Sequence, residues 1–201
     1  MPKVTDEHRE QRREQILSAA WDLFAGNGFH NTSMAQIIAA SDLSAGAVYL
    51  YFRSKEDLIV ATAEKALGAA HGAAGELLAA NRPVSPGEAM RLMLGRIEQL
   101  HRSAGGAFFP VAIQAWAEAV RSPVISATAR RFFAALLGDW GELLRRWQDS
   151  GHPLAGRPDD LARMVIATIQ GYLIQRVSFG AEHDERFLEV LADRITGMVT
   201  A

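Results

Sequence analysis

One pair of side chains has the spacing of a metal-binding helix. Glu98 and His101 form a Glu-x-x-His pair one helical turn apart, as in bundles that hold two iron ions between carboxylates. Such a site needs a second pair and two further glutamates on facing helices, and the sequence has no second pair. It also lacks cysteine, HExxH, a phosphate-binding glycine loop and Gly-x-Ser-x-Gly. We therefore predict no cofactor, no bound metal and no enzyme.

A second set of residues has the spacing of a DNA-binding helix pair. Thr32 or Ser33 can cap a short helix over residues 34–40, and Ser33 and Gln36 have capping-box spacing. After a turn at residues 41–44, Ser44 can cap a second short helix that runs to Phe52. In helix-turn-helix proteins such a pair places its second helix in the DNA major groove. Many other helical proteins contain short helix pairs, so the spacing alone leaves the function open.

The rest of the chain is predicted to be helical as well. Apolar residues recur at three- and four-residue spacing, and no stretch alternates as a half-buried strand would. We predict an all-α fold of about nine helices: one that ends at residues 26–28, then 34–40, 44–52, 55–80, 86–102, 107–121, 123–150, 159–179 and 185–199. A Pro- and Gly-containing loop near residues 81–87 divides the chain. The predicted domains are residues 1–58, with a connecting helix to about 80, and residues 84–201.

The helix pair and its flanks, residues 15–58, contain a set of residues with a recognisable spacing: Ile16, Ala20, Phe24, Gly28, Thr32, Ile37, Leu43, Ser44, Gly46, Tyr49, Phe52, Lys55 and Leu58. With these residues the stretch resembles the N-terminal domain of TetR/AcrR-type transcriptional regulators. In that family the N-terminal helices bind DNA, and the C-terminal helices hold a ligand pocket and a dimer interface. The resemblance thus implies a homodimer, by the family's usual mode a repressor, that binds a palindromic operator in double-stranded DNA and is released by a small, largely apolar effector.

The resemblance also implies particular DNA contacts. Hydroxyls, a lysine and a helix start would contact phosphates, while small residues would let the second helix approach the base edges. Tyr49 and Tyr51 point in nearly opposite directions on a helix, so one of them can belong to the core. The implied DNA-contacting residues are Thr32, Ser33, Gln36, Ser44, Ala45, Gly46, Ala47, Tyr49, Tyr51 and Lys55.

Three positions depart from the family pattern. Asp42 stands where the family usually has glycine, at a turn position that needs a left-handed backbone, which Asp tolerates better than most residues. Ala35 and Ala45 replace a frequent arginine and a frequent lysine. The second helix therefore has no side chain for a bidentate contact to a base, although alanine can contact a thymine methyl group.

The last two predicted helices have wide apolar stripes, which a four-helix bundle across a two-fold axis would bury. The predicted dimer interface comprises Leu161, Val165, Thr168, Tyr172, Phe187, Leu191 and Ile195. Aromatic side chains mixed with a few polar ones suggest an apolar ligand cavity. Its predicted residues are His101, Phe108, Gln114, Trp116, Phe133, Trp140, Gln170 and Tyr172. For both sets the alternative is packing within one chain.

Composition is compatible with these predictions. The 201 residues carry 21 Lys and Arg against 23 Asp and Glu, so the sequence lacks the basic excess that an architectural DNA-binding protein would have. No apolar run approaches the roughly 18 residues of a membrane helix, and the N-terminus lacks an apolar signal core. We therefore expect a cytoplasmic protein with no membrane partner.

Overall fold

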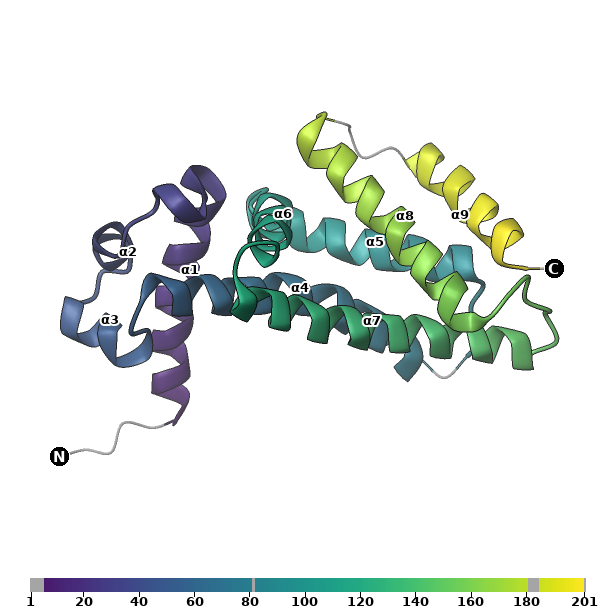
Figure 1. The fold of residues 1–201 in the computed structure, drawn as a ribbon, viewed down its shortest axis with the longest axis horizontal. Helices are drawn as coiled ribbons and strands as arrows, with labels where there is room; N and C mark the ends of the chain where they lie inside the picture. The colour runs from purple at the N-terminus through teal and green to yellow at the C-terminus, as the bar shows by residue number, and fades with distance from the viewer. Residues whose placement is uncertain (1–5, 81, 181–184, 201) are drawn as a thin grey trace. The chain divides into compact units, whose positions relative to one another are not determined.

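The computed structural model describes residues 6–80, 82–180 and 185–200, and in these ranges it contains nine α-helices and no strand (Figure 1). The all-α prediction is confirmed. An isolated antiparallel bridge pairs Leu154 with Thr200. The helices are α1 Asp6–Asn31, α2 Met34–Ala40, α3 Ala45–Tyr51, α4 Lys55–Ala79, α5 Pro86–Ser103, α6 Phe108–Ala119, α7 Pro123–Asp149, α8 Pro158–Ser178 and α9 Glu185–Val199.

Proline and glycine set several helix ends. Pro86, Pro123 and Pro158 are the first residues of their helices, where the missing N–H has no intrahelical partner to lose. Pro110 lies in the first turn of α6, one of the two positions expected for it. The predicted stop of the first helix appears as a break inside α1, because Gly28 has φ 84° and ψ 162°.

The chain forms two compact units that do not follow the order of the sequence. Unit 1 comprises residues 1–66 and 104–129, and unit 2 comprises residues 67–103 and 130–201. Helices α4 and α7 each contribute residues to both units. Helix α6 therefore packs with the N-terminal helices. The predicted functional division at residues 58 and 84 stays a prediction.

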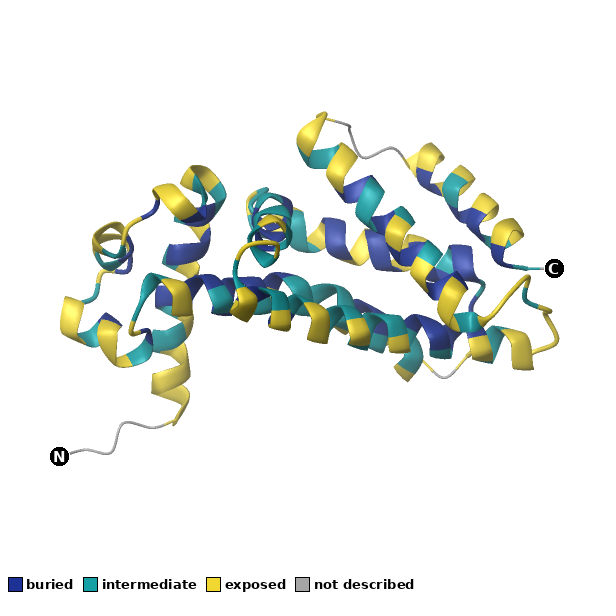
Figure 2. Cartoon of the chain, viewed as in Figure 1, coloured by how far each residue is buried: buried dark blue, intermediate teal, exposed yellow. Residues whose placement is uncertain are grey.

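The core of unit 1 holds the helix-turn-helix in place. One stripe of α1 is buried at four-residue spacing, and α2, α3 and α4 each add an apolar side chain with no exposed surface (Figure 2). Phe24 contacts Phe29 edge to face, with ring centroids 4.9 Å apart, across the break at Gly28. The fully buried residues of this core include Ile16, Ala20, Phe24, Ile37, Val48 and Leu58.

The core of unit 2 is formed by α5, α7, α8 and α9. Helix α5 packs most extensively on α9, and Gly87 permits the close approach of the two backbones. A buried ion pair joins α5 to α8, since Arg176 Nη2 donates to Glu98 Oε1 at 2.9 Å. The large buried side chains of this unit include Met90, Met93, Leu94, Ile97, Trp140, Leu144 and Ile166.

Candidate nucleic-acid interface

Helix α2 begins with the predicted capping box. The Ser33 N–H donates to Gln36 Oε1 at 2.8 Å, and the Gln36 N–H donates to Ser33 Oγ at 3.3 Å. The capping role, which the sequence left open between two residues, thus belongs to Ser33. Thr32 is only 1 % exposed, and its hydroxyl donates to the carbonyl oxygen of Gly28 at 2.9 Å. Its side chain is thereby occupied in fastening the start of α2 to α1.

The turn before α3 has the backbone that the sequence predicts. Asp42 has φ 55° and is the sole non-glycine residue with positive φ in the described part of the chain. Ser41 is buried and ends α2, and its carbonyl oxygen accepts a hydrogen bond from Gln15 Nε2 at 2.7 Å. The turn is therefore fixed from both sides, by its own backbone and by α1.

Helix α3 has one buried and one exposed face. Ser44 caps it, because the Ala47 N–H donates to Ser44 Oγ at 3.2 Å. Val48 is fully buried, and Ala47 and Tyr51 are partly buried beside it. Tyr49 lies on the opposite face at 47 % exposure, so the two tyrosines differ in burial as their spacing suggests. The exposed face consists of Ala45, Gly46, Tyr49 and Leu50.

Leu50 was missed as a candidate residue. It is 85 % exposed, although leucine is usually buried. A signal existed in the sequence, because Leu50 follows Gly46 by one helical turn and so shares its face.

Few cations lie on or near the helix pair. From Asn31 to Phe52 the sequence has no lysine or arginine. Lys55, at the start of α4, is partly buried, and its Nζ donates to the carbonyl oxygen of His30 at 3.3 Å. The Arg13 guanidinium lies over the Phe52 ring, 5.4 Å from its centroid. Arg53, Lys55 and Lys65 are the lysines and arginines nearest in sequence to the exposed face of α3.

Gln114 of α6 holds the break in α1. Its Nε2 donates to the carbonyl oxygen of Phe24 at 3.0 Å, and its Oε1 accepts from the N–H of Phe29 at 2.9 Å. One amide side chain thus satisfies a carbonyl and an N–H that the break at Gly28 leaves without helical partners. An open cavity of about 300 Å³ adjoins this contact, lined by Gly28, Phe29, His30, Asn31, Gln114, Ala117, Glu118 and Arg121.

The predicted ligand-binding residues are divided between the two units. Phe108, Gln114 and Trp116 lie in unit 1, where Phe108 contacts Trp21 and Phe109. His101, Phe133, Trp140, Gln170 and Tyr172 lie in unit 2. Trp140 is fully buried, and its indole N–H has no hydrogen-bond partner among the described residues.

The Glu-x-x-His pair serves a structural role in unit 2. Glu98 is buried and is bound to Arg176, and no group of three His, Cys, Asp or Glu residues suited to a metal ion occurs in the described ranges. Burial lowers the pKa of the His101 imidazole below its ordinary value. Glu98 opposes this shift, and the charges of Arg176 and Arg102 add to it.

Some of the predicted dimer-interface residues are buried within the single chain, and others are exposed. Leu161, Val165, Tyr172 and Ile195 are buried within the chain itself, whereas Thr168 and Leu191 are partly exposed. Phe187 is exposed, although its ring is stacked on Tyr172 with centroids 6.3 Å apart. The exposed large apolar side chains of α8 and α9 are Ile174, Phe187, Val190 and Met198.

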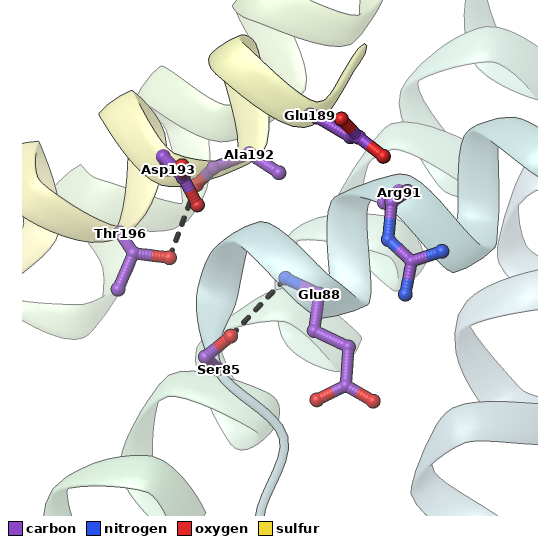
Figure 3. Close-up of a pocket in the computed structure, with 7 residues that line it drawn as sticks. All are labelled: Ser85, Glu88, Arg91, Glu189, Ala192, Asp193 and Thr196. Atoms are coloured by element: carbon purple, nitrogen blue, oxygen red, sulfur yellow. Dashed lines mark hydrogen bonds between the residues drawn. The ribbon is translucent and has the colours of Figure 1, made fainter. Parts of the chain in front are cut away.

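A polar groove lies between the start of α5 and α9 (Figure 3). It measures about 320 Å³ and is lined by Ser85, Glu88, Arg91, Glu189, Ala192, Asp193 and Thr196. The hydroxyls of Ser85 and Thr196 are occupied within the chain, by the N–H of Glu88 and by the carbonyl of Ala192. This charged lining does not suit the apolar ligand that the sequence suggests, and none of the predicted ligand residues contributes to it.

A capped helix pair with an exposed second helix is the arrangement found in helix-turn-helix DNA-binding proteins. Residues 16–62 match the family described as "Bacterial regulatory proteins, tetR family". The chain is 46 % identical over 57 residues to the HTH-type transcriptional regulator YfiR of Bacillus subtilis (strain 168), a match that covers 28 % of each chain. The chain thus aligns with less than a third of that relative's length.

Solved structures extend the similarity beyond the helix-turn-helix. GusR of Salmonella enterica superposes with a TM-score of 0.75 and 26 % identity, over 98 % of this chain and 99 % of that one. NemR of E. coli in its reduced form also has a TM-score of 0.75, at 19 % identity, over 94 % of this chain and 97 % of that one.

The N-terminal region, residues 16–62, is thus similar to the tetR family of bacterial regulatory proteins, in agreement with the resemblance stated from the sequence. The matching family and YfiR are both described as regulatory proteins rather than as enzymes, in agreement with the prediction of no enzymatic activity. No described helix is long and apolar enough to cross a membrane.

Proposed function

We propose that the protein is a homodimeric transcriptional repressor that binds a palindromic operator and is released by a small, largely apolar ligand. The exposed face of α3, presented by two capped helices within the region that matches the family, is the observation that carries this proposal. Residues 1–58 would bind DNA, and residues 84–201 would bind the ligand and the second subunit.

The proposed DNA contacts follow the exposure of each side chain. Ala45, Gly46 and Tyr49 face the bases, Ser44 retains a hydroxyl hydrogen for a phosphate, and Lys55 donates to a phosphate beside α3. Ser33 and Gln36 lie on the surface at the start of α2. We leave the Thr32 side chain out of the contact set because it is buried, and Tyr51 contributes at most an edge because it is partly buried.

The proposed dimer face is the exposed side of α8 and α9. On α9, Phe187, Val190, Leu191 and Met198 occupy one arc, adjacent to the arc that is buried within the chain. A second copy would bury these apolar side chains and place two α3 helices in successive major grooves, about one helical turn of DNA apart.

The proposed ligand site is the aromatic interior of unit 2. A buried indole N–H without a partner costs about 1–3 kcal/mol, and a ligand oxygen beside Trp140 would remove that cost. Phe133, Gln170 and Tyr172 belong to the same unit. Gln114 is left out of this proposed site because both polar atoms of its amide are bonded to α1.

Release would follow from linkage. A ligand lowers DNA affinity only by as much as it prefers the conformation that cannot bind the operator. Helix α4 begins directly after the helix-turn-helix, and its second half belongs to unit 2. A ligand-dependent shift of that second half would therefore also move the first residues of α4.

The first test of the proposal is selection of genomic fragments by the purified protein, followed by footprinting and fluorescence anisotropy. We expect a short palindrome, and we expect Lys55→Ala to weaken binding and to flatten the log–log salt dependence by about 2 for a dimer with one phosphate contact per subunit. Arg91→Ala, an exposed cation on α5, is the matched control and should change neither quantity. No enrichment of any fragment at moderate salt would refute the proposal.

Separate measurements test the dimer and the ligand. Val190→Glu should convert a dimer to a monomer in light scattering, whereas the exposed Glu189→Gln should not. Trp140→Phe removes the unpaired N–H, so the variant should keep its DNA affinity and lose the thermal stabilisation given by ligands found in a screen of aromatic and aliphatic acids. A promoter fusion that is activated rather than repressed by the protein would refute the repressor assignment.

A further inference from the structure

We propose that the exposed face of α3 selects the operator by apolar contact with thymine methyl groups, with Leu50 as the principal reader. This inference rests on the proposed DNA binding and adds the chemistry by which bases are distinguished.

The hydroxyl group of Tyr49 is the one side-chain hydrogen-bond donor or acceptor on this face. Its residues are Ala45, Gly46, Tyr49 and Leu50, and the whole stretch from Ser44 to Phe52 contains no Arg, Lys, Asn, Gln, Asp or Glu. Guanine is usually recognised by Arg or Lys, adenine by Asn or Gln, and cytosine by a carboxylate. None of these contacts can come from α3.

Leu50 is 85 % exposed, whereas Val48 is the residue by which α3 is anchored in the core. A single exposed leucine is common on protein surfaces and by itself has no meaning. Here, however, the leucine shares its face with two small residues and a tyrosine, in the helix of the family-matched region that would enter the major groove.

The thymine C5-methyl is the apolar group that base pairs present in the major groove. Ala45 has only a methyl group and Gly46 has no side chain, so the helix backbone can approach the base edges. Leu50 lies five residues beyond Ala45, about 7.5 Å further along the axis. The two residues would therefore reach different base pairs, and the preferred half-site would carry thymine at both positions.

The size of the effect follows from the burial of one methyl group. Removal of one buried methyl weakens binding by about fourfold, and removal of a symmetric pair from the two half-sites by about 15-fold. A bidentate hydrogen bond to the correct base discriminates against a wrong base more strongly than one methyl contact does. We therefore expect a degenerate operator with thymine preferences.

The experiment replaces thymidine with deoxyuridine, which lacks only the methyl group, at one symmetric pair of positions at a time in the selected operator. Anisotropy titrations with wild-type protein should show a loss of about 15-fold at one or two positions. Leu50→Ala should bind the thymidine and deoxyuridine duplexes equally at the position that Leu50 reads. Val120→Ala, which truncates an 86 % exposed apolar residue outside α3, is the matched control and should keep the wild-type profile.

The outcomes separate this inference from the function on which it rests. If the protein binds no DNA sequence selectively, the proposed function fails and this inference fails with it. If it binds an operator but no deoxyuridine pair changes the affinity by more than twofold, or if Leu50→Ala keeps the full methyl sensitivity, the inference alone is overturned. Leu50 is exposed, so an unchanged melting temperature of the variant will show that its fold is intact.

Discussion

The contact between Gly87 and α9 leaves no room for any side chain. A Cβ built on Gly87 would lie 1.9 Å from the carbonyl oxygen of Ala192 and 2.6 Å from Thr196 Oγ1. Carbon and oxygen normally approach no closer than about 3.3 Å, so Gly87→Ala would push the two helices roughly 1.4 Å apart. The atom in the way belongs to the backbone, and no change of rotamer can relieve the clash.

The expected cost has two main parts. The separation breaks the hydrogen bond from the Gly87 N–H to Thr196 Oγ1, now 3.0 Å, which contributes about 1 kcal/mol. Overpacking of a close contact adds about 1–3 kcal/mol, and the better helix propensity of alanine returns less than about 1 kcal/mol near a helix start. We expect the free energy of unfolding to fall by about 2–3 kcal/mol, a decrease of roughly 4–12 °C in melting temperature for a chain of this length.

The assay is guanidinium and thermal unfolding followed by circular dichroism, with Gly95→Ala as the matched control. Gly95 lies in the middle of the same helix with no heavy atom within 4 Å of a built Cβ, so this variant should gain up to about 1 kcal/mol. Thr196→Ala should not rescue Gly87→Ala, because the clash with the Ala192 carbonyl remains. If Gly87→Ala is as stable as the wild type, the close approach of α5 and α9 is wrong.

Three further predictions concern other parts of the chain. Asp42→Gly should raise the free energy of unfolding by up to about 1 kcal/mol because glycine adopts φ 55° without strain. Asp22→Gly, inside α1, should lower it by a similar amount. If urea titrations show that both variants change the free energy of unfolding in the same direction, this reasoning is contradicted. Gln114→Ala should lower the free energy of unfolding by about 2 kcal/mol because it breaks two hydrogen bonds to α1. Gln99→Ala, at an exposed position, should change it by almost nothing, and an equal loss for both variants in the same titration would refute this prediction. Because burial lowers the pKa of His101, the unfolded state binds its proton first, so the free energy of unfolding should fall as pH drops below about 6.5; His101→Gln should flatten this dependence between pH 7.5 and 5, and an unchanged slope would refute the argument.

Much of the local structure follows from the sequence because its signals act over a few residues. The capping box of Ser33 and Gln36, the positive φ of Asp42 and the helix starts at Pro86 and Pro123 depend on neighbours within one turn. Each of these features is recognisable without knowledge of the fold, and each occurs in the structure where the sequence places it.

The assignments that require knowledge of packing partners were less complete. An apolar stripe tells which residues share a helix face but not which surface covers them, so Val165 and Ile195 were assigned to a dimer interface although the chain buries them itself. Gln114 could not be recognised as the partner of a break 86 residues earlier in the chain, because no local pattern links Gly28 to α6. Thr32 is a similar case. The sequence shows a hydroxyl that could contact DNA, but not that this hydroxyl donates a hydrogen bond to α1.

Helix α9 shows how the two kinds of prediction are connected. Its buried arc rests on α5, and its exposed arc carries Val190 and Met198, so the contact at Gly87 fixes the position of the face that we propose for dimerisation. A shift of α9 by more than 1 Å would move these side chains out of register with a second copy, where an interface depends on close complementarity. Gly87→Ala should therefore weaken the dimer in light scattering by more than its loss of stability explains, whereas Gln114→Ala should lower stability without changing the dimer. If both variants weaken the dimer equally, the interface does not depend on the contact between α5 and α9.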